Sequence, residues 1–170
     1  MEQAGGRVQR RDRQMEKHMN TDHIRALIAK LLNLKAAGQV HLYDQQRFIR
    51  LGDPDSLDTP TCIAGWAYRL SGWNRRLMQT YSQLAQTWLG LNDTQAAYLF
   101  DGCPYSPLKT DPEHVPDPTI DDAIAVLEHL IKSNSVEWCT QTPTGRRLLG
   151  KKYGRKDPYK AILKDWEAHQ

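Results

Sequence analysis

Residues 119–131 have the clearest pattern in this chain, and it is the pattern of an amphipathic α-helix. Thr119 and Asp122 have the spacing of a capping box, in which each side chain bonds the backbone N–H group of the other residue. Apolar residues then recur at helical spacing: Ile120, Ala123, Ile124, Leu127, Leu130 and Ile131. Such a helix is stable when other elements cover its apolar face, so the rest of the chain should supply packing partners.

Four further segments have apolar residues at helical spacing, namely residues 21–38, 59–72, 78–90 and 92–100. Thr21 and Asn92 are the expected N-caps of two of these segments. Gly38, Gly72 and Gly90 are the expected stops of three of them. The pattern therefore predicts an all-α fold, a single compact bundle of about five or six helices.

The segment TPTCIAGWAYRLSG, residues 59–72, places a glycine in the middle of an expected helix. Thr59 is the expected N-cap and Pro60 the expected first helical residue. The apolar face of this helix carries Ile63, Trp66, Ala67 and Leu70. Gly65 weakens a helix by about 1 kcal/mol relative to alanine, so we expect that close approach of a neighbouring element offsets this loss. In this interpretation Cys62, Gly65 and Trp66 form a structural motif.

The composition is that of a polar globular protein. The chain has 170 residues, which favours one domain, and its mean hydropathy is −0.68. No apolar stretch approaches the roughly 20 residues of a membrane span, and the N-terminal residues lack a signal-peptide pattern. We therefore expect a cytoplasmic protein that makes no membrane contact. Cys62, Cys103 and Cys139 are an odd number of cysteines at wide spacing, which indicates reduced thiols.

Charge is distributed unevenly along the chain. Residues 1–20 have five basic and three acidic side chains, residues 21–140 have ten and fourteen, and residues 141–170 have eight and three. We interpret these three parts as a flexible arm, a helical domain and a basic C-terminal extension. The extension is expected to end in a short amphipathic helix that begins at Asp157, and a further short helix is expected after Asp44.

The basic extension contains the strongest candidate binding site. Six cations lie within eleven residues: Arg146, Arg147, Lys151, Lys152, Arg155 and Lys156. Such a cluster can neutralise phosphates, so nucleic acid or another polyanion is one expected partner. Two alternatives are the acidic body of the same chain, onto which the extension would fold back, and a partner protein that also contacts Leu148 and Leu149.

No pattern predicts a metal or a cofactor. The cysteines, together with His114 and His129, lack the paired spacing of a zinc site. The acidic residues between positions 111 and 122 lack the ordered spacing and central glycine of a calcium loop.

Two further chemical interpretations are weaker than their structural alternatives. Cys62 with His41 as a base could form a thiol enzyme, but a buried thiol packed beside Gly65 explains the same residues. Residues 84–100 are arranged like a helix-turn-helix, but the second helix has no lysine or arginine. A recognition helix needs to face phosphates, so an ordinary corner of the core is the better interpretation.

The segment CIAGWA, residues 62–67, resembles a group of small uncharacterised helical proteins from bacteria and their phages. Further shared features are the run LGL at residues 89–91, then Ala96, Leu99 and Phe100, and finally Val136 with Trp138. The resemblance covers residues 21–140. It implies a shared helical core, and it brings no activity, cofactor or site residue with it.

These patterns favour a non-enzymatic function. We expect a small intracellular protein-interaction module of the phage or mobile-element accessory kind, which binds a host or phage protein. The first alternative is a nucleic-acid-binding protein that uses residues 141–170, and the second is a thiol-dependent enzyme that uses Cys62.

Overall fold

The computed structural model describes residues 19–46, 60–72, 80–100, 104–105 and 116–153. These residues form α1 (Thr21–Ala36), a 3-10 helix (Val40–Leu42), α2 (Ile63–Ser71), α3 (Tyr81–Leu89), α4 (Asp93–Phe100), α5 (Ile120–Ser133), α6 (Trp138–Gln141) and α7 (Pro143–Tyr153). The all-α class is confirmed. The described part has seven α-helices, more than the expected number, because residues 138–153 form α6 and α7 without a clear helical pattern in their sequence.

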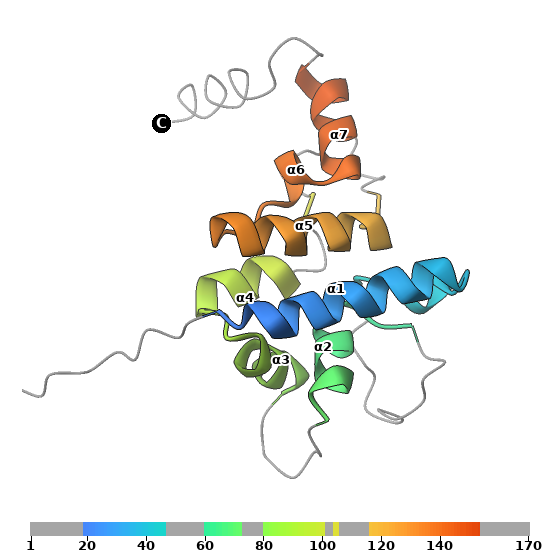
Figure 1. The fold of residues 1–170 in the computed structure, drawn as a ribbon. Helices are drawn as coiled ribbons and strands as arrows, with labels where there is room; N and C mark the ends of the chain where they lie inside the picture. The colour runs from blue at the N-terminus through green and yellow to red at the C-terminus, as the bar shows by residue number, and fades with distance from the viewer. Residues whose placement is uncertain (1–18, 47–59, 73–79, 101–103, 106–115, 154–170) are drawn as a thin grey trace, which may run out of the picture.

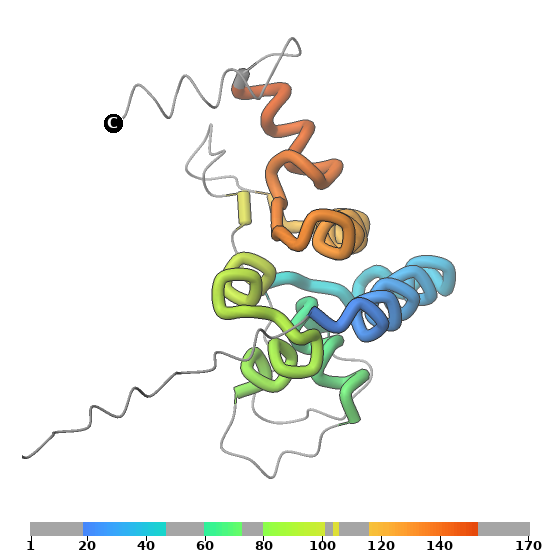
Figure 2. Tube along the Cα trace, turned by 60° about the vertical axis from the view of Figure 1, so that its left-hand side comes forward, coloured from blue at the N-terminus to red at the C-terminus, as the bar shows by residue number. Residues whose placement is uncertain are grey.

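Helix α1 lies at the centre of the arrangement (Figure 1). It contacts α5 on one side and α2 and α3 on the other, and a view turned by 60° shows the same order (Figure 2). The inward face of α1 is completely buried at Ile24, Leu27 and Leu31. The facing side of α5 is buried at Ile120, Ala123, Val126, Leu127 and Leu130. Each large aliphatic side chain buried in this way contributes about 1.5–3 kcal/mol, so the α1–α5 contact is a major part of the core.

The expected helix stops are confirmed, and one expected N-cap is wrong. Gly38, Gly72 and Gly90 follow the ends of α1, α2 and α3 with φ values of 70°, 64° and 67°, a conformation that glycine adopts without strain. The N-cap of α1 is Asn20 and not Thr21. Asn20 Oδ1 accepts a hydrogen bond from His23 N at 3.2 Å, which leaves Thr21 free to take a helical conformation.

Two other expected N-terminal caps are confirmed. Asn92 Oδ1 accepts from Gln95 N at 2.8 Å, and Gln95 Oε1 accepts from Asn92 N at 3.1 Å, so the two side chains cap α4 reciprocally. Thr119 and Asp122 form the expected capping box at the start of α5. These caps involve residues only three positions apart, which is why the local sequence predicts them.

Helix α2 begins later than expected. Thr61 pairs with the chain beyond the 3-10 helix, because Thr61 N donates to Leu42 O at 3.1 Å and Asp44 N donates to Thr61 O at 3.2 Å. Because this pairing keeps Thr61 extended, the expectation that Pro60 is the first helical residue is wrong. The N-cap of α2 is Cys62. Thr59 lies outside the described residues.

Helix α2 is buried over most of its surface rather than on one face. All six residues from Ile63 to Tyr68 are buried, Gly65 among them, whereas Leu70 is 37% exposed and does not belong to the buried face. Trp66 is 2% exposed, and its Nε1 donates to Leu42 O at 3.3 Å. Trp66 thus fastens α2 to the 3-10 helix, while close approach to Gly65 stays a prediction.

Several expected features lie outside the described residues: most of the arm, the short helix after Asp44 and the helix from Asp157. At the N-terminal boundary Asn20 N donates to Leu89 O at 2.9 Å, so residue 20 is attached to the end of α3. The expected boundary after residue 140 falls inside α6, and α7 contacts both α5 and α6.

None of the helices in the described part of the chain combines the length and the apolar character needed to cross a bilayer.

Candidate functional site

The predicted basic residues that the structure describes lie on α7, which extends from the body beyond α6 (Figure 1). Arg146, Arg147 and Lys151 are exposed, Lys152 is half-buried, and Arg155 and Lys156 lie outside the described residues. Residues three or four positions apart share one face of a helix. The outward face of α7, called here the basic face, accordingly consists of the exposed residues Pro143, Arg146, Arg147 and Lys151 and the half-buried Gly150.

The cations of the basic face are not neutralised by the described part of the chain. The two ion pairs found there join Arg25 to Asp22 at 3.1 Å and Lys35 to Asp121 at 2.6 Å. Neither includes a residue of α7. For Arg146, Arg147 and Lys151, the interpretation in which the extension folds back onto acidic residues therefore gains no support from the described residues.

A buried carboxylate holds the first turn of α7. Asp122 is completely buried, and its Oδ2 accepts from Thr119 N at 2.9 Å and from Thr119 Oγ1 at 3.0 Å. Its other oxygen, Oδ1, accepts from Thr144 N at 2.9 Å. Asp122 therefore satisfies backbone donors at the N-terminal ends of both α5 and α7, where a negative charge also interacts favourably with the helix dipoles.

A buried hydroxyl completes this junction. Thr142 Oγ1 donates to Trp138 O at 2.6 Å and accepts from Gly145 N at 3.0 Å, so it links the end of α6 to the start of α7. Because the single Thr142 hydroxyl proton is directed at Trp138 O, Tyr105 OH is the donor in its 2.8 Å contact with Thr142 Oγ1. Burial raises the pKa of Tyr105, and the charge of Asp122 raises it further, so the phenol keeps its proton.

The two glycines of α7 have opposite surroundings. A Cβ atom on Gly145 would lie 2.3 Å from Cys139 O and 2.4 Å from Trp138 O, so α7 approaches the backbone of α6 too closely for any side chain. A Cβ atom on Gly150 would meet nothing within 4 Å. Close packing therefore explains why position 145 is a glycine, but it does not explain the glycine at position 150.

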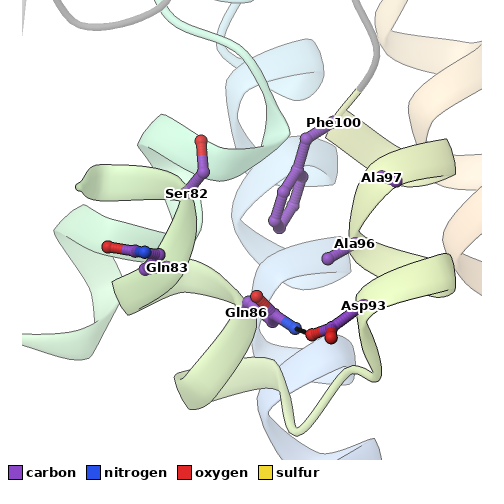
Figure 3. Close-up of a pocket in the computed structure, with 7 residues that line it drawn as sticks. All are labelled: Ser82, Gln83, Gln86, Asp93, Ala96, Ala97 and Phe100. Atoms are coloured by element: carbon purple, nitrogen blue, oxygen red, sulfur yellow. Dashed lines mark hydrogen bonds between the residues drawn. The ribbon is translucent and has the colours of Figure 1, made fainter. Parts of the chain in front are cut away.

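A second candidate site is an open groove between α3 and α4, with a volume of about 400 Å³ (Figure 3). Its lining consists of Ser82, Gln83, Gln86, Asp93, Ala96, Ala97 and Phe100. The small side chains of Ala96 and Ala97 leave the space, and the ring of Phe100 projects into it between the two helices. Gln86 Nε2 donates to Asp93 Oδ1 at 2.7 Å across the groove.

Tyr98 follows Ala97 on α4 but lies about 100° further round the helix, outside the lining of the groove. Its side chain is 62% exposed, the highest value among the large hydrophobic residues of the described part. Its backbone position is fixed, since Trp138 Nε1 donates to Tyr98 O at 2.9 Å. An exposed tyrosine on a fixed backbone is typical of residues that bind protein partners.

The structure does not favour nucleophilic chemistry at Cys62. The side chain is 1% exposed, and burial raises the pKa of its thiol, although backbone N–H groups of Ala64 and Gly65 act in the opposite direction. The expected base, His41, is exposed on the 3-10 helix. Burial also raises the pKa of the half-buried Cys139. Among the described residues, no three histidine, cysteine or acidic side chains lie close enough together to hold a metal ion.

The sequence predicts part of these sites and misses part. It identifies the cations of α7 and the local role of Asp122 in α5, but it gives no sign of the bond from Asp122 to Thr144, which is 22 residues away. The groove depends on how two helices cross, and the local sequence does not contain that information. One signal in the sequence could have drawn attention to the groove: α3 and α4 contain no lysine or arginine, so their surface differs in charge from that of α7.

No protein-family model, curated protein or solved structure matches this chain, so its geometry is the basis for a functional proposal.

Proposed function

We propose that this chain is a non-enzymatic protein-interaction module and that its contact surface is the exposed side of α4, which runs from the α3–α4 groove at Ala97 round to Tyr98. The observation that carries the proposal is the combination of an open groove of about 400 Å³ with an aromatic side chain that is 62% exposed. Enclosed pockets bury most of a small ligand, whereas an open groove accepts side chains that project from a larger partner. As part of this proposal, we keep the expectation that the module is an intracellular accessory protein of phage or mobile-element type.

The chemistry of the surface supports a protein partner. Helices α3 and α4 carry no cation and one acidic residue, Asp93, which already bonds Gln86. The groove amides are partly used within the fold, since Gln86 Nε2 donates to Leu91 O and Asp93 Oδ1 and Gln83 Oε1 accepts from Thr80 N, which leaves Gln83 Nε2 and Gln86 Oε1 for a partner. Ala97 is exposed and lets another backbone approach. Aromatic anchors surrounded by adaptable polar groups are characteristic of protein interfaces, and tyrosine is enriched among the residues that dominate binding energy.

The test is capture of the partner with the full chain and with variants of this surface. Partner retained from nuclease-treated lysate in high salt is measured quantitatively for the wild type, Tyr98→Ala and Ala97→Arg. The side chain of Ala97 is exposed, and Tyr98 uses only its backbone oxygen within the fold, so neither change should disturb folding. Loss of a tyrosine anchor of about 2 kcal/mol should weaken binding about 30-fold.

Leu32→Ala is the matched control, because Leu32 is 48% exposed on α1, away from the groove. It should leave partner binding unchanged. A partner that binds all four proteins equally would show that the groove and Tyr98 are not the contact surface.

A further inference from the structure

We propose that the basic face of α7 binds the phosphate backbone of nucleic acid without sequence specificity, with Gly150 as the point of closest approach. This inference concerns a different element from the α3–α4 groove and does not depend on it.

The composition of the basic face distinguishes phosphate from an acidic protein as the ligand. Arg146, Arg147 and Lys151 are exposed there, and the two remaining positions are a proline and a glycine. Leu149 is 2% exposed and Leu148 packs against the core, so both leucines of α7 face inward. Protein interfaces need buried aromatic or aliphatic anchors, and none of the five residues of this face provides one. Phosphates need only positive charge and hydrogen-bond donors, which it has.

The spacing of the cations suits a nucleic acid. Arg146 and Lys151 are five residues apart, which is about 7.5 Å along a helix axis. A duplex carries one negative charge for about each 1.7 Å of its axis, so all three side chains can reach different phosphates together. Helix α7 is also fixed before binding, because Asp122 and Thr142 hold its first turn, and no ordering of the helix opposes association.

Gly150 supplies an independent observation. A glycine inside a helix weakens that helix relative to alanine, and a Cβ atom at position 150 would meet nothing within 4 Å. The fold therefore does not require this glycine. Gly150 is half-buried between the exposed Arg147 and Lys151, and the space where its Cβ would lie is empty, so a phosphate can come closer there than any side chain would allow.

The test measures the affinity of the full chain for a fluorescein-labelled duplex of about 20 base pairs and mixed sequence, by anisotropy between about 0.05 and 0.2 M KCl. Each phosphate neutralised adds about −0.9 to the slope of log K against log salt concentration. Each of Arg146→Gln, Arg147→Gln and Lys151→Gln should reduce the slope by about 0.9, and the triple variant by about 2.7. Lys132→Gln is the control, because Lys132 is an exposed cation in the last turn of α5. It should leave the slope unchanged.

Gly150→Ala tests close approach without any change in charge. We expect weaker binding at every salt concentration with the slope unchanged, while the urea midpoint of unfolding stays the same or rises. Unchanged affinity for Gly150→Ala would remove position 150 from the proposal. Slopes that are the same for the triple variant and the wild type would overturn the phosphate site itself. Tight binding of poly-glutamate with no binding of duplex would overturn it in favour of an acidic protein.

Discussion

Replacement of Gly145 by alanine gives the sharpest test of how α7 is attached to the body. The added Cβ atom would lie 2.3 Å from Cys139 O, 2.4 Å from Trp138 O and 2.7 Å from Cys139 C. Real Cβ atoms essentially never come within 3.0 Å of such neighbours, and all three of these are backbone atoms that cannot rotate away. The α6–α7 turn must therefore open by most of an ångström. That movement stretches the bond from Gly145 N to Thr142 Oγ1, which is now 3.0 Å long.

Two opposing contributions determine how much Gly145→Ala changes the free energy of unfolding. Overpacking in a closely fitted region costs about 1–3 kcal/mol, and the upper end applies because the backbone itself must move. Alanine also favours the helix over glycine by about 1 kcal/mol. The free energy of unfolding should therefore fall by about 2 kcal/mol, and in a chain of this size the thermal midpoint should fall by about 4–8 °C.

Urea and thermal unfolding of the full chain, followed by circular dichroism, measure this change. Gly150→Ala is the matched comparison, because it makes the same substitution in the same helix at a position with no neighbour within 4 Å. Only the helix preference acts there, so its unfolding free energy should rise by about 0.5–1 kcal/mol. The reasoning is refuted if Gly145→Ala is as stable as the wild type, or if both alanines have the same effect.

Two further predictions concern buried polar groups. Asp122→Asn should lower the unfolding free energy by about 1–3 kcal/mol in urea titrations, because an amide can offer only one acceptor oxygen to the donors of Thr119 and Thr144; a variant as stable as the wild type would show that the carboxylate does not hold α7. Burial raises the pKa of Tyr43 well above its ordinary value of 10.0 and that of Cys62 above 9.0. Above these ordinary values the unfolded chain releases protons that the folded chain retains, so stability should fall as pH rises beyond about 9. The fall above pH 10 should be smaller in Tyr43→Phe, and an identical decline in urea midpoint for that variant would contradict the assignment.

The parts of the fold that the sequence predicts correctly are those determined by residues close together in the chain. Thr119 and Asp122 form their capping box within one turn, and Asn92 caps α4 in the same way. The start of α2 could not be predicted, because Thr61 is held in an extended conformation by Leu42, nineteen residues earlier. Local propensity at position 61 is overridden by that pairing.

Helix α7 shows why the candidate site was only partly predictable. Pro143, Gly145 and Gly150 give residues 143–153 a weak intrinsic preference for helix, and the pattern alone favours an irregular basic extension. The helix forms because tertiary contacts supply what the local sequence lacks. Asp122 from α5 accepts from the first turn of α7, and the absence of a side chain at Gly145 allows α7 to lie directly on α6. The cations are visible in the sequence, but their collection on one exposed face depends on these distant contacts.

The two proposed surfaces are connected through one residue, Trp138, and this connection determines which variants can test them separately. Trp138 in α6 donates from Nε1 to Tyr98 O on α4, and its own carbonyl accepts from Thr142, which precedes α7. A substitution at Trp138 would therefore disturb both surfaces and could not separate them. Tyr98→Ala and Lys151→Gln change exposed side chains on either side of Trp138. If the proposals are independent, the first variant should weaken only the protein partner and the second only the duplex. Loss of both ligands in either variant would mean that the surfaces act as one site coupled through α6.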